Sequence, residues 1–204
     1  MLRGLVLNGG GGNAVNIPGA GTVVLDHLRI GGGQGSAVRA APNGPLNLTV
    51  SNSIITGAGI GTTYGAGLQV LPAAGGTAQV TLDHVVISAN PFGVAFDGSG
   101  STGGINATIK DSVFSGNDQD GIVATTSSGH APIGILISNS TSSNNGFGVR
   151  SIGQNVTVRV KGSEIIGNGT GMAASGGGAL LSLGSNVVRA NGSDGAFTGS
   201  LPLQ

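Results

Sequence analysis

The segment "DHVVISANPFGVAF", residues 83–96, decides the fold because its pattern returns along the chain. A small polar or charged pair comes first, an apolar residue follows two or three positions later, and a Gly-plus-aliphatic step comes near the end. The same skeleton occurs in "DHLRIGGGQGSAVRA" (26–40), "KDSVFSGNDQDGIVA" (110–124) and "KGSEIIGNGTGMAA" (161–174). Such repetition is typical of a solenoid, in which each unit buries its apolar face against its neighbours.

The large residue after each polar pair measures the period. It falls at Leu7, Ile30, Ile55, Ile87, Phe114, Ser142, Ile165 and Val188, with spacings of 23 to 32 residues. Segments such as "AQVTLDH" (78–84) and "VTVRVKG" (156–162) alternate apolar and polar residues, which indicates strands. We therefore predict an all-β chain with residues 1–204 in one domain. The expected fold is a single-stranded parallel β-helix of about eight coils with three parallel sheets, right-handed because parallel crossovers nearly always are.

Two columns of residues support the coil alignment. The joints between the first and second strands align as Gly4, His27, Asn52, His84, Asp111, Asn139 and Gly162. These residue types are enriched at positive φ, so a left-handed corner explains them without invoking chemistry. Three residues past the period marker lies a second column, Asn90, Asn117, Asn145, Asn168 and Asn191. Stacked amides both donate and accept hydrogen bonds, so we predict a structural asparagine ladder along this column.

These repeats resemble the right-handed parallel β-helix of the pectate-lyase-like superfamily, and more narrowly the bacterial right-handed β-helix region proteins. The resemblance covers essentially the whole chain. It implies a fold rather than a function, since the superfamily includes lyases, hydrolases, epimerases, phage spikes and adhesins.

Composition limits the partners and the compartment. Only 8% of the residues are charged and they balance to zero, which argues against binding of nucleic acid. No apolar run reaches the roughly 18 residues of a membrane span. The chain has no cysteine, and its first residues lack the features of a signal peptide. We expect a fragment of a longer exported or cell-surface protein.

The resemblance implies a catalytic cleft on the outer face of the third-strand sheet. A lyase-like calcium site needs several carboxylates, yet on this face we expect only Asp97. The segments "NDQDG" (117–121), "GH" (129–130) and "RVK" (159–161) are loosely similar to a polygalacturonase, but the neighbouring pair of aspartates is missing. The remaining catalytic candidates are Asp97, Asp118, Asp120 and Arg150. The alternative is that Asp118 and Asp120 are turn residues and that Arg150 is a solvated strand residue.

No cofactor and no metal site are predicted. The two corner histidines, His27 and His84, lie two coils apart, about 10 Å, which is too far for one ion. Each follows an aspartate, but adjacent residues need not form a hydrogen bond. Both histidines are therefore interpreted as corner residues.

Three functions remain open. The leading hypothesis is a non-catalytic β-helix that acts as a scaffold or interaction surface. The alternatives are a carbohydrate-active enzyme, either a polysaccharide lyase or a hydrolase, and a glycan-binding module centred on Tyr64. A polysaccharide is the expected partner, and self-association is expected through the N-terminal end (Leu2, Leu5 and Leu7) or the third-strand face (Leu71, Val123 and Ile152). Phe197, Leu201 and Leu203 are expected to fold back over the last coil.

Overall fold

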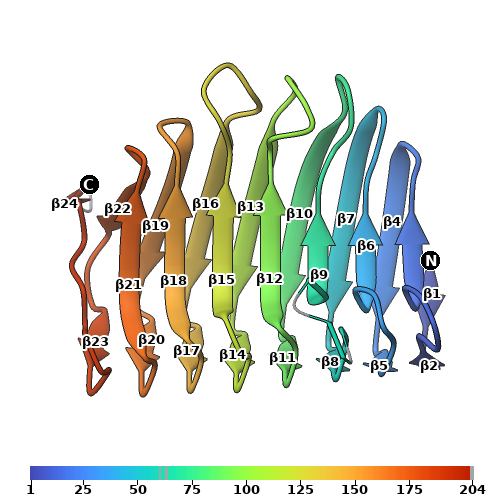
Figure 1. Cartoon of the computed structure of the whole chain (residues 1–204), viewed down its shortest axis with the longest axis horizontal. Helices are drawn as coiled ribbons and strands as arrows, with labels where there is room; N and C mark the ends of the chain where they lie inside the picture. The colour runs from blue at the N-terminus through green and yellow to red at the C-terminus, as the bar shows by residue number, and fades with distance from the viewer. Residues whose placement is uncertain (60, 63, 203–204) are drawn as a thin grey trace.

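The computed structural model describes residues 1–59, 61–62 and 64–202. The chain winds along one long axis from the N-terminus to the C-terminus, and equivalent strands of successive coils lie side by side (Figure 1). Every strand pairs in parallel with its equivalents one coil away, which confirms the predicted β-helix with three parallel sheets. Within the described ranges, no helix has the length and apolar character needed to cross a membrane.

Sheet A is formed by the first strand of each coil, and over the described residues it contains nine strands. In spatial order they are β1 (Leu2–Arg3), β4 (Gly21–Asp26), β7 (Pro45–Ser51), β10 (Thr77–Asp83), β13 (Ile105–Lys110), β16 (Ile133–Ser138), β19 (Val156–Lys161), β22 (Ala179–Ser182) and β24 (Gly199–Ser200). Alternation of apolar and polar residues sends every second side chain inward, so that Val80 and Leu82 are buried while Gln79 is exposed.

Sheet B is formed by short second strands and contains eight of them in the part of the chain that is described. They are β2 (Val6–Asn8), β5 (Arg29–Gly31), β8 (Ile54–Thr56), β11 (Val86–Ser88), β14 (Val113–Ser115), β17 (Thr141–Ser143), β20 (Glu164–Ile166) and β23 (Val187–Arg189). The eight period markers occupy one register along this sheet, and Ile30, Ile55, Ile87 and Phe114 are fully buried in the core.

Sheet C is formed by the third strands, seven of them among the described residues. They are β3 (Val15–Ile17), β6 (Val38–Ala40), β9 (Ala66–Val70), β12 (Phe92–Asp97), β15 (Asp120–Thr125), β18 (Phe147–Ile152) and β21 (Thr170–Ser175). Val94, Phe96 and Ile122 point into the core, where they complete the apolar filling between the three sheets.

The corner between sheets A and B has the predicted backbone conformation in every aligned coil. The corner residues have φ values of 69° at Gly4, 53° at His27, 50° at Asn52, 53° at His84, 50° at Asp111, 48° at Asn139 and 57° at Gly162. Because asparagine, aspartate, histidine and glycine tolerate this left-handed region better than other residues, the corner composition follows from the backbone geometry.

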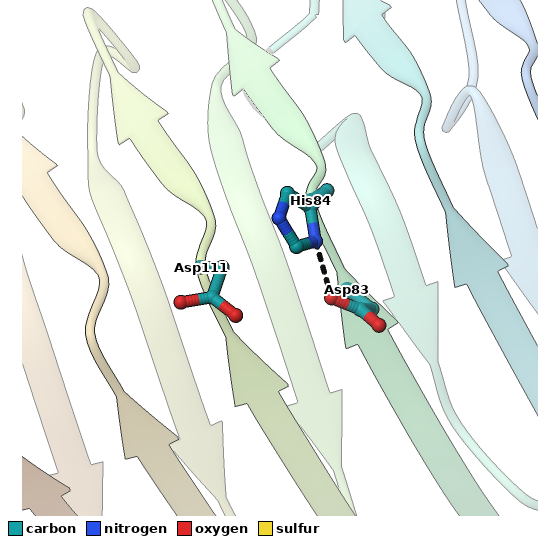
Figure 2. Close-up of side chains that lie close together, drawn as sticks. All are labelled: Asp83, His84 and Asp111. Atoms are coloured by element: carbon teal, nitrogen blue, oxygen red, sulfur yellow. Dashed lines mark hydrogen bonds and ion pairs between the residues drawn. The ribbon is translucent and has the colours of Figure 1, made fainter.

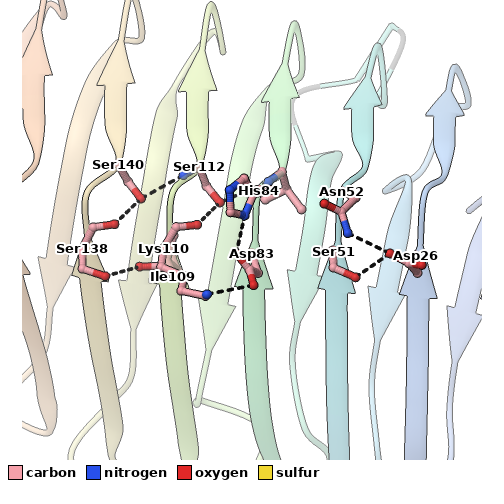
Figure 3. Close-up of polar contacts among 11 residues, drawn as sticks. Asp26, Ser51, Asn52, Asp83, His84, Ile109, Lys110, Ser112, Ser138 and Ser140 are labelled. Atoms are coloured by element: carbon pink, nitrogen blue, oxygen red, sulfur yellow. Dashed lines mark hydrogen bonds and ion pairs between the residues drawn. The ribbon is translucent and has the colours of Figure 1, made fainter.

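A column of buried serines directly follows these corners, and the sequence analysis did not identify it. The backbone nitrogen of Val85 donates to Oγ of Ser112, that of Ser112 to Oγ of Ser140, and that of Ser140 to Oγ of Ser163, each at 3.2 Å. Each hydroxyl in turn donates to the carbonyl two residues earlier, as Ser112 does to Lys110 at 2.6 Å (Figure 3). These serines satisfy buried backbone donors from coil to coil.

The asparagine ladder lies between sheets B and C. Each amide nitrogen Nδ2 donates to Oδ1 of the next member, at 3.0 Å from Asn90 to Asn117 and 2.9 Å from Asn117 to Asn145. The series continues to Asn168 at 3.0 Å and to Asn191 at 2.9 Å. The first four amides are almost completely buried.

The two ends of the β-helix differ. At the C-terminal end Phe197 packs against the core, as predicted, whereas Leu201 is exposed and Leu203 lies outside the described residues. At the N-terminal end Leu2 and Leu5 are 38% and 42% exposed, while Leu7 packs against the core. Self-association through this end stays a prediction.

Candidate functional site

The outer face of sheet C holds two adjoining cavities. The first, of about 310 Å³, is lined by Asn13, Gln34, Gly35, Ser36, Arg39, Thr62, Tyr64, Gly65 and Gln69. The second, of about 290 Å³, is lined by Tyr64, Gln69, Phe92, Ala95, Asp97, Val123, Thr125, Arg150 and Ile152. Both share Tyr64 and Gln69, so together they form one elongated depression that follows the long axis of the β-helix. Tyr64 is 82% exposed at the junction.

The structure brings together only part of the predicted catalytic group. Asp97 and Arg150 line the same cavity, and Arg150 forms an ion pair with Asp120. Asp118 is exposed on the turn before β15 and does not line this cavity. Asp120 is the first residue of β15 and is fully buried. The alternative interpretation is therefore correct for Asp118, which lies on a turn, and wrong for Asp120, while Arg150 is a strand residue that is partly exposed and paired with Asp120.

The burial of Asp120 follows from its neighbours in adjacent coils. Asp120 is in register with Phe147 of the next coil, and the guanidinium of Arg150 stacks over the Phe147 ring at 4.5 Å from its centroid. Arg150 thereby covers the carboxylate to which it is bound. Burial raises the pKa of Asp120 to about 6, although the Arg150 guanidinium acts in the opposite direction. Among the described residues, Oδ1 of Asp120 has no hydrogen-bond partner.

This raised pKa predicts a pH-dependent loss of stability. A carboxyl whose pKa rises on folding contributes stability below its unfolded pKa, and that contribution is lost as pH increases through the folded value. From pH 4 to pH 8, ionised Asp120 should lower the free energy of unfolding by on the order of 2–3 kcal/mol. Urea unfolding at pH 4 and at pH 8 measures this difference in free energy. Asp120→Asn should not show the decrease, whereas Asp118→Asn should show it as the wild type does. The prediction would be contradicted if the free energy of unfolding of the wild type fell no more between pH 4 and pH 8 than that of Asp120→Asn.

The third-strand face is less apolar than the sequence predicts. Val123 was expected to join Leu71 and Ile152 in an exposed apolar patch, but it is only 5% exposed. Leu71 and Ile152 are half-buried. Val123 therefore adds little exposed apolar area to this face, and self-association through it stays a prediction.

A third cavity lies on the outer face of sheet A, where the sequence analysis predicted no site. It measures about 310 Å³, and the outward side chains that line it are Gln79, Thr81, Asn106, Thr108, Leu136 and Arg159. Gly134 contributes no side chain, which deepens the surface between Asn106 of the preceding coil and Thr157 of the following coil. Its sequence signal is a glycine within an otherwise alternating strand.

Charged residues also gather along the corner between sheets A and B (Figure 3). Asp26 accepts hydrogen bonds from Nδ2 of Asn52 at 3.0 Å and from Oγ of Ser51 at 2.8 Å, and Nδ1 of His27 lies 2.8 Å from it. These contacts, with Asn52 contributing most, hold the pKa of Asp26 well below its usual range. The interpretation of His27 as a corner residue is confirmed by its φ of 53°, and the structure adds a contact with the preceding aspartate that the sequence left open.

The second Asp–His corner is paired in the same way. Nδ1 of His84 lies 2.6 Å from Oδ1 of Asp83, and Nζ of Lys110 lies 2.9 Å from the other carboxylate oxygen. Asp111 of the next coil approaches this pair, so one potential metal-binding atom from each of Asp83, His84 and Asp111 lies within 4.8 Å of the others (Figure 2). His84 and Asp111 occupy the same corner column of the sequence, in adjacent coils, whereas His84 and His27 lie two coils apart.

Comparison with known proteins agrees with this architecture. The family described as right handed beta helix region matches residues 13–188, which span nearly all of the coils described above. Neither a curated protein nor a solved structure matches the chain. The parallel strands of successive coils and the family match lead to the same conclusion: the chain belongs to the right-handed β-helix region family.

Proposed function

We propose that the chain is a non-catalytic β-helix module that binds a neutral polysaccharide along the outer face of sheet C. The observation that carries the proposal is the pair of adjoining cavities that share Tyr64 and Gln69. An elongated depression with an exposed aromatic ring and amide side chains suits a polymer of sugar rings, because the ring presents an apolar face while amides orient hydroxyl groups.

The charges of the depression favour a neutral ligand. Its charged lining residues are Arg39, Asp97 and Arg150. Arg150 is already paired with Asp120, so Arg39 and Asp97 leave one charge of each sign. A strongly acidic polysaccharide would need an excess of cations on this face, and the described lining residues supply no such excess.

The arrangement of carboxylates supports binding over hydrolysis. A glycosidase needs two carboxyl groups that both reach the scissile bond, typically about 5–9.5 Å apart. In the sheet C depression Asp97 is the one carboxylate among the described lining residues, because Asp120 is buried under Arg150. Asp97 itself accepts a hydrogen bond from the backbone nitrogen of Ser99 at 2.9 Å, as residues at the ends of strands commonly do.

The experiment is a binding and cleavage screen against neutral and acidic polysaccharides. We expect binding of a neutral polymer, at least about tenfold weaker for Tyr64→Ala, because truncation of a central aromatic removes a large contact area. Val86→Ala, at an exposed position of sheet B, is the matched control and should bind like the wild type. No release of sugar ends is expected.

Three results would overturn the proposal. One is cleavage that is lost in Asp97→Asn, which would make the chain an enzyme. Another is unchanged binding in Tyr64→Ala together with loss in Asn106→Ala, which would place the site on sheet A. The third is an absence of binding to every polymer in the panel.

A further inference from the structure

Two of the corners between sheets A and B begin with the same dipeptide and have the same geometry. Asp26 ends β4 and Asp83 ends β10, and the histidine that follows each has a φ of 53°. In both corners Nδ1 of the histidine contacts Oδ1 of the aspartate, at 2.8 Å and 2.6 Å. In both, the second carboxylate oxygen contacts a cation, at 3.1 Å for Arg3 and 2.9 Å for Lys110.

The corners differ in the corner residue that the next coil supplies, and in the cation, which comes from the preceding coil for Arg3 and from the following coil for Lys110. Beside Asp26 that residue is Asn52, whose amide donates to the carboxylate at 3.0 Å and completes a network of partners. Beside Asp83 it is Asp111, which has no proton to donate at neutral pH. Among the described residues no side chain or backbone group donates a hydrogen bond to the Asp111 carboxylate. Figure 2 shows this carboxylate in the neighbourhood of the His84 imidazole and the Asp83 carboxylate.

The second corner therefore places two carboxylates and one imidazole around a common point, with their potential ligand atoms within 4.8 Å of one another. Two carboxylates at such separation repel each other unless a cation lies between them. Lys110 contacts Oδ2 of Asp83 at 2.9 Å and also interacts with the charge of Asp111, so it offsets part of this repulsion. Two carboxylates and one ammonium group leave the site with an excess of negative charge beside the nitrogen atoms of His84.

We propose that Asp83, His84 and Asp111 bind a divalent metal ion of the zinc class. One imidazole and two carboxylates are the donor types that zinc accepts, and three protein ligands with a water molecule complete its tetrahedral coordination. Bond lengths of about 2.0–2.2 Å require ligand atoms roughly 3–3.5 Å apart, which small rotations of these side chains achieve since His84 and Asp111 are exposed. Calcium fits less well because it takes six to eight oxygen ligands.

The backbone makes the site specific to this corner. The positive φ values at His84 and Asp111 set the directions of both side chains, and the parallel pairing of β10 with β13 places the two corners in adjacent coils. The third histidine of the chain, His130, is exposed in the loop 126–132, outside this corner. His27 therefore offers the matched control, since it has the same corner and the same aspartate contact but an asparagine in place of Asp111.

The test is a titration of the untagged full chain with Zn²⁺ by calorimetry, with Ca²⁺ as a parallel arm. We expect one Zn²⁺ per chain, and affinity at least about tenfold weaker in His84→Asn and in Asp111→Asn. Both variants should keep the fold, because asparagine already occupies this corner position at Asn52 and Asn139. His27→Asn and His130→Asn should bind like the wild type. Lys110→Gln should bind more tightly, because it removes a competing cation.

A gain of binding provides the sharper result. Asn52→Asp gives the first corner the three ligand types of the second, so this variant should bind two Zn²⁺ ions per chain. The proposal is overturned if the wild type binds no Zn²⁺, if Ca²⁺ binds more tightly than Zn²⁺, or if His27→Asn weakens binding as much as His84→Asn. None of these variants lies on the sheet C face, so failure here leaves polysaccharide binding untouched.

Discussion

Replacement of Asn117 by leucine is expected to lower the free energy of unfolding by about 3–6 kcal/mol, since several buried hydrogen bonds are lost in one step. Oδ1 of Asn117 accepts from the backbone nitrogen of Asn90 at 3.2 Å and from its Nδ2 at 3.0 Å. Nδ2 of Asn117 donates to Oδ1 of Asn145 at 2.9 Å and to the carbonyl of Ile87 at 3.4 Å. Leucine makes none of these bonds and adds branched carbon atoms in a closely packed column.

Two asparagines serve as controls for Asn117→Leu. Asn106 is exposed on sheet A, and Asn106→Leu should change stability by less than about 0.5 kcal/mol. Asn191 is half-buried at the end of the ladder, so water can replace some of the hydrogen bonds that Asn191→Leu removes. The free energy of unfolding should therefore fall less for Asn191→Leu than for Asn117→Leu. Urea unfolding measures all three. Equal losses for Asn117→Leu and Asn106→Leu would show that the ladder does not stabilise the coils.

Replacement of Gly148 by alanine is expected to cost more than about 3 kcal/mol, because the added methyl group has no space. A Cβ atom at this position would lie 2.5 Å from the carbonyl oxygen of Gly171, 2.6 Å from Cγ2 of Ile165 and 2.8 Å from Nδ2 of Asn168. The first of these atoms belongs to the backbone of the next coil, so relief requires two coils to move apart. That movement would stretch the asparagine ladder at Asn168.

The same close approach recurs in each coil of this region. A Cβ at Gly93 would lie 2.4 Å from the carbonyl oxygen of Gly121, and a Cβ at Gly121 would lie 2.9 Å from that of Gly148. The matched control is Gly75→Ala, at a glycine with no atom within 4 Å of the added methyl group and no positive φ. Thermal unfolding should separate the two variants clearly. If Gly148→Ala were as stable as Gly75→Ala, the two coils would be able to move apart at this turn with little loss of stability.

The coil alignment was predictable from the sequence for local physical reasons. Only a few residue types tolerate positive φ, so His27, Asn52 and Asp111 mark the corners in the sequence itself. A buried amide needs partners above and below, so Asn90, Asn117 and their equivalents mark a second column. Each constraint acts within one coil and repeats in the next, which makes the register readable without long-range information.

The candidate sites depend on side-chain directions and loop positions that no local rule specifies. The predicted register brings four candidate residues close together, namely Asp97, Asp118, Asp120 and Arg150. Asp120 is nevertheless buried beneath Arg150, so it cannot reach a ligand in the depression that Asp97 lines. The depression on sheet C requires the loop that carries Tyr64 to lie over the sheet, and loop conformation is set by packing rather than by spacing in the sequence.

The sequence by itself therefore determined a β-helix of repeated coils, its corners and its asparagine ladder, because these features follow from backbone preferences repeated at each turn. Tertiary structure alone decided that Asp83, His84 and Asp111 converge while the carboxylate of Asp26 is hydrogen-bonded by Asn52. The physical reason is that charge and hydrogen bonding between adjacent coils depend on the rotamer of each side chain, and an amide in place of a carboxylate changes the balance of charge at a corner with the same backbone geometry.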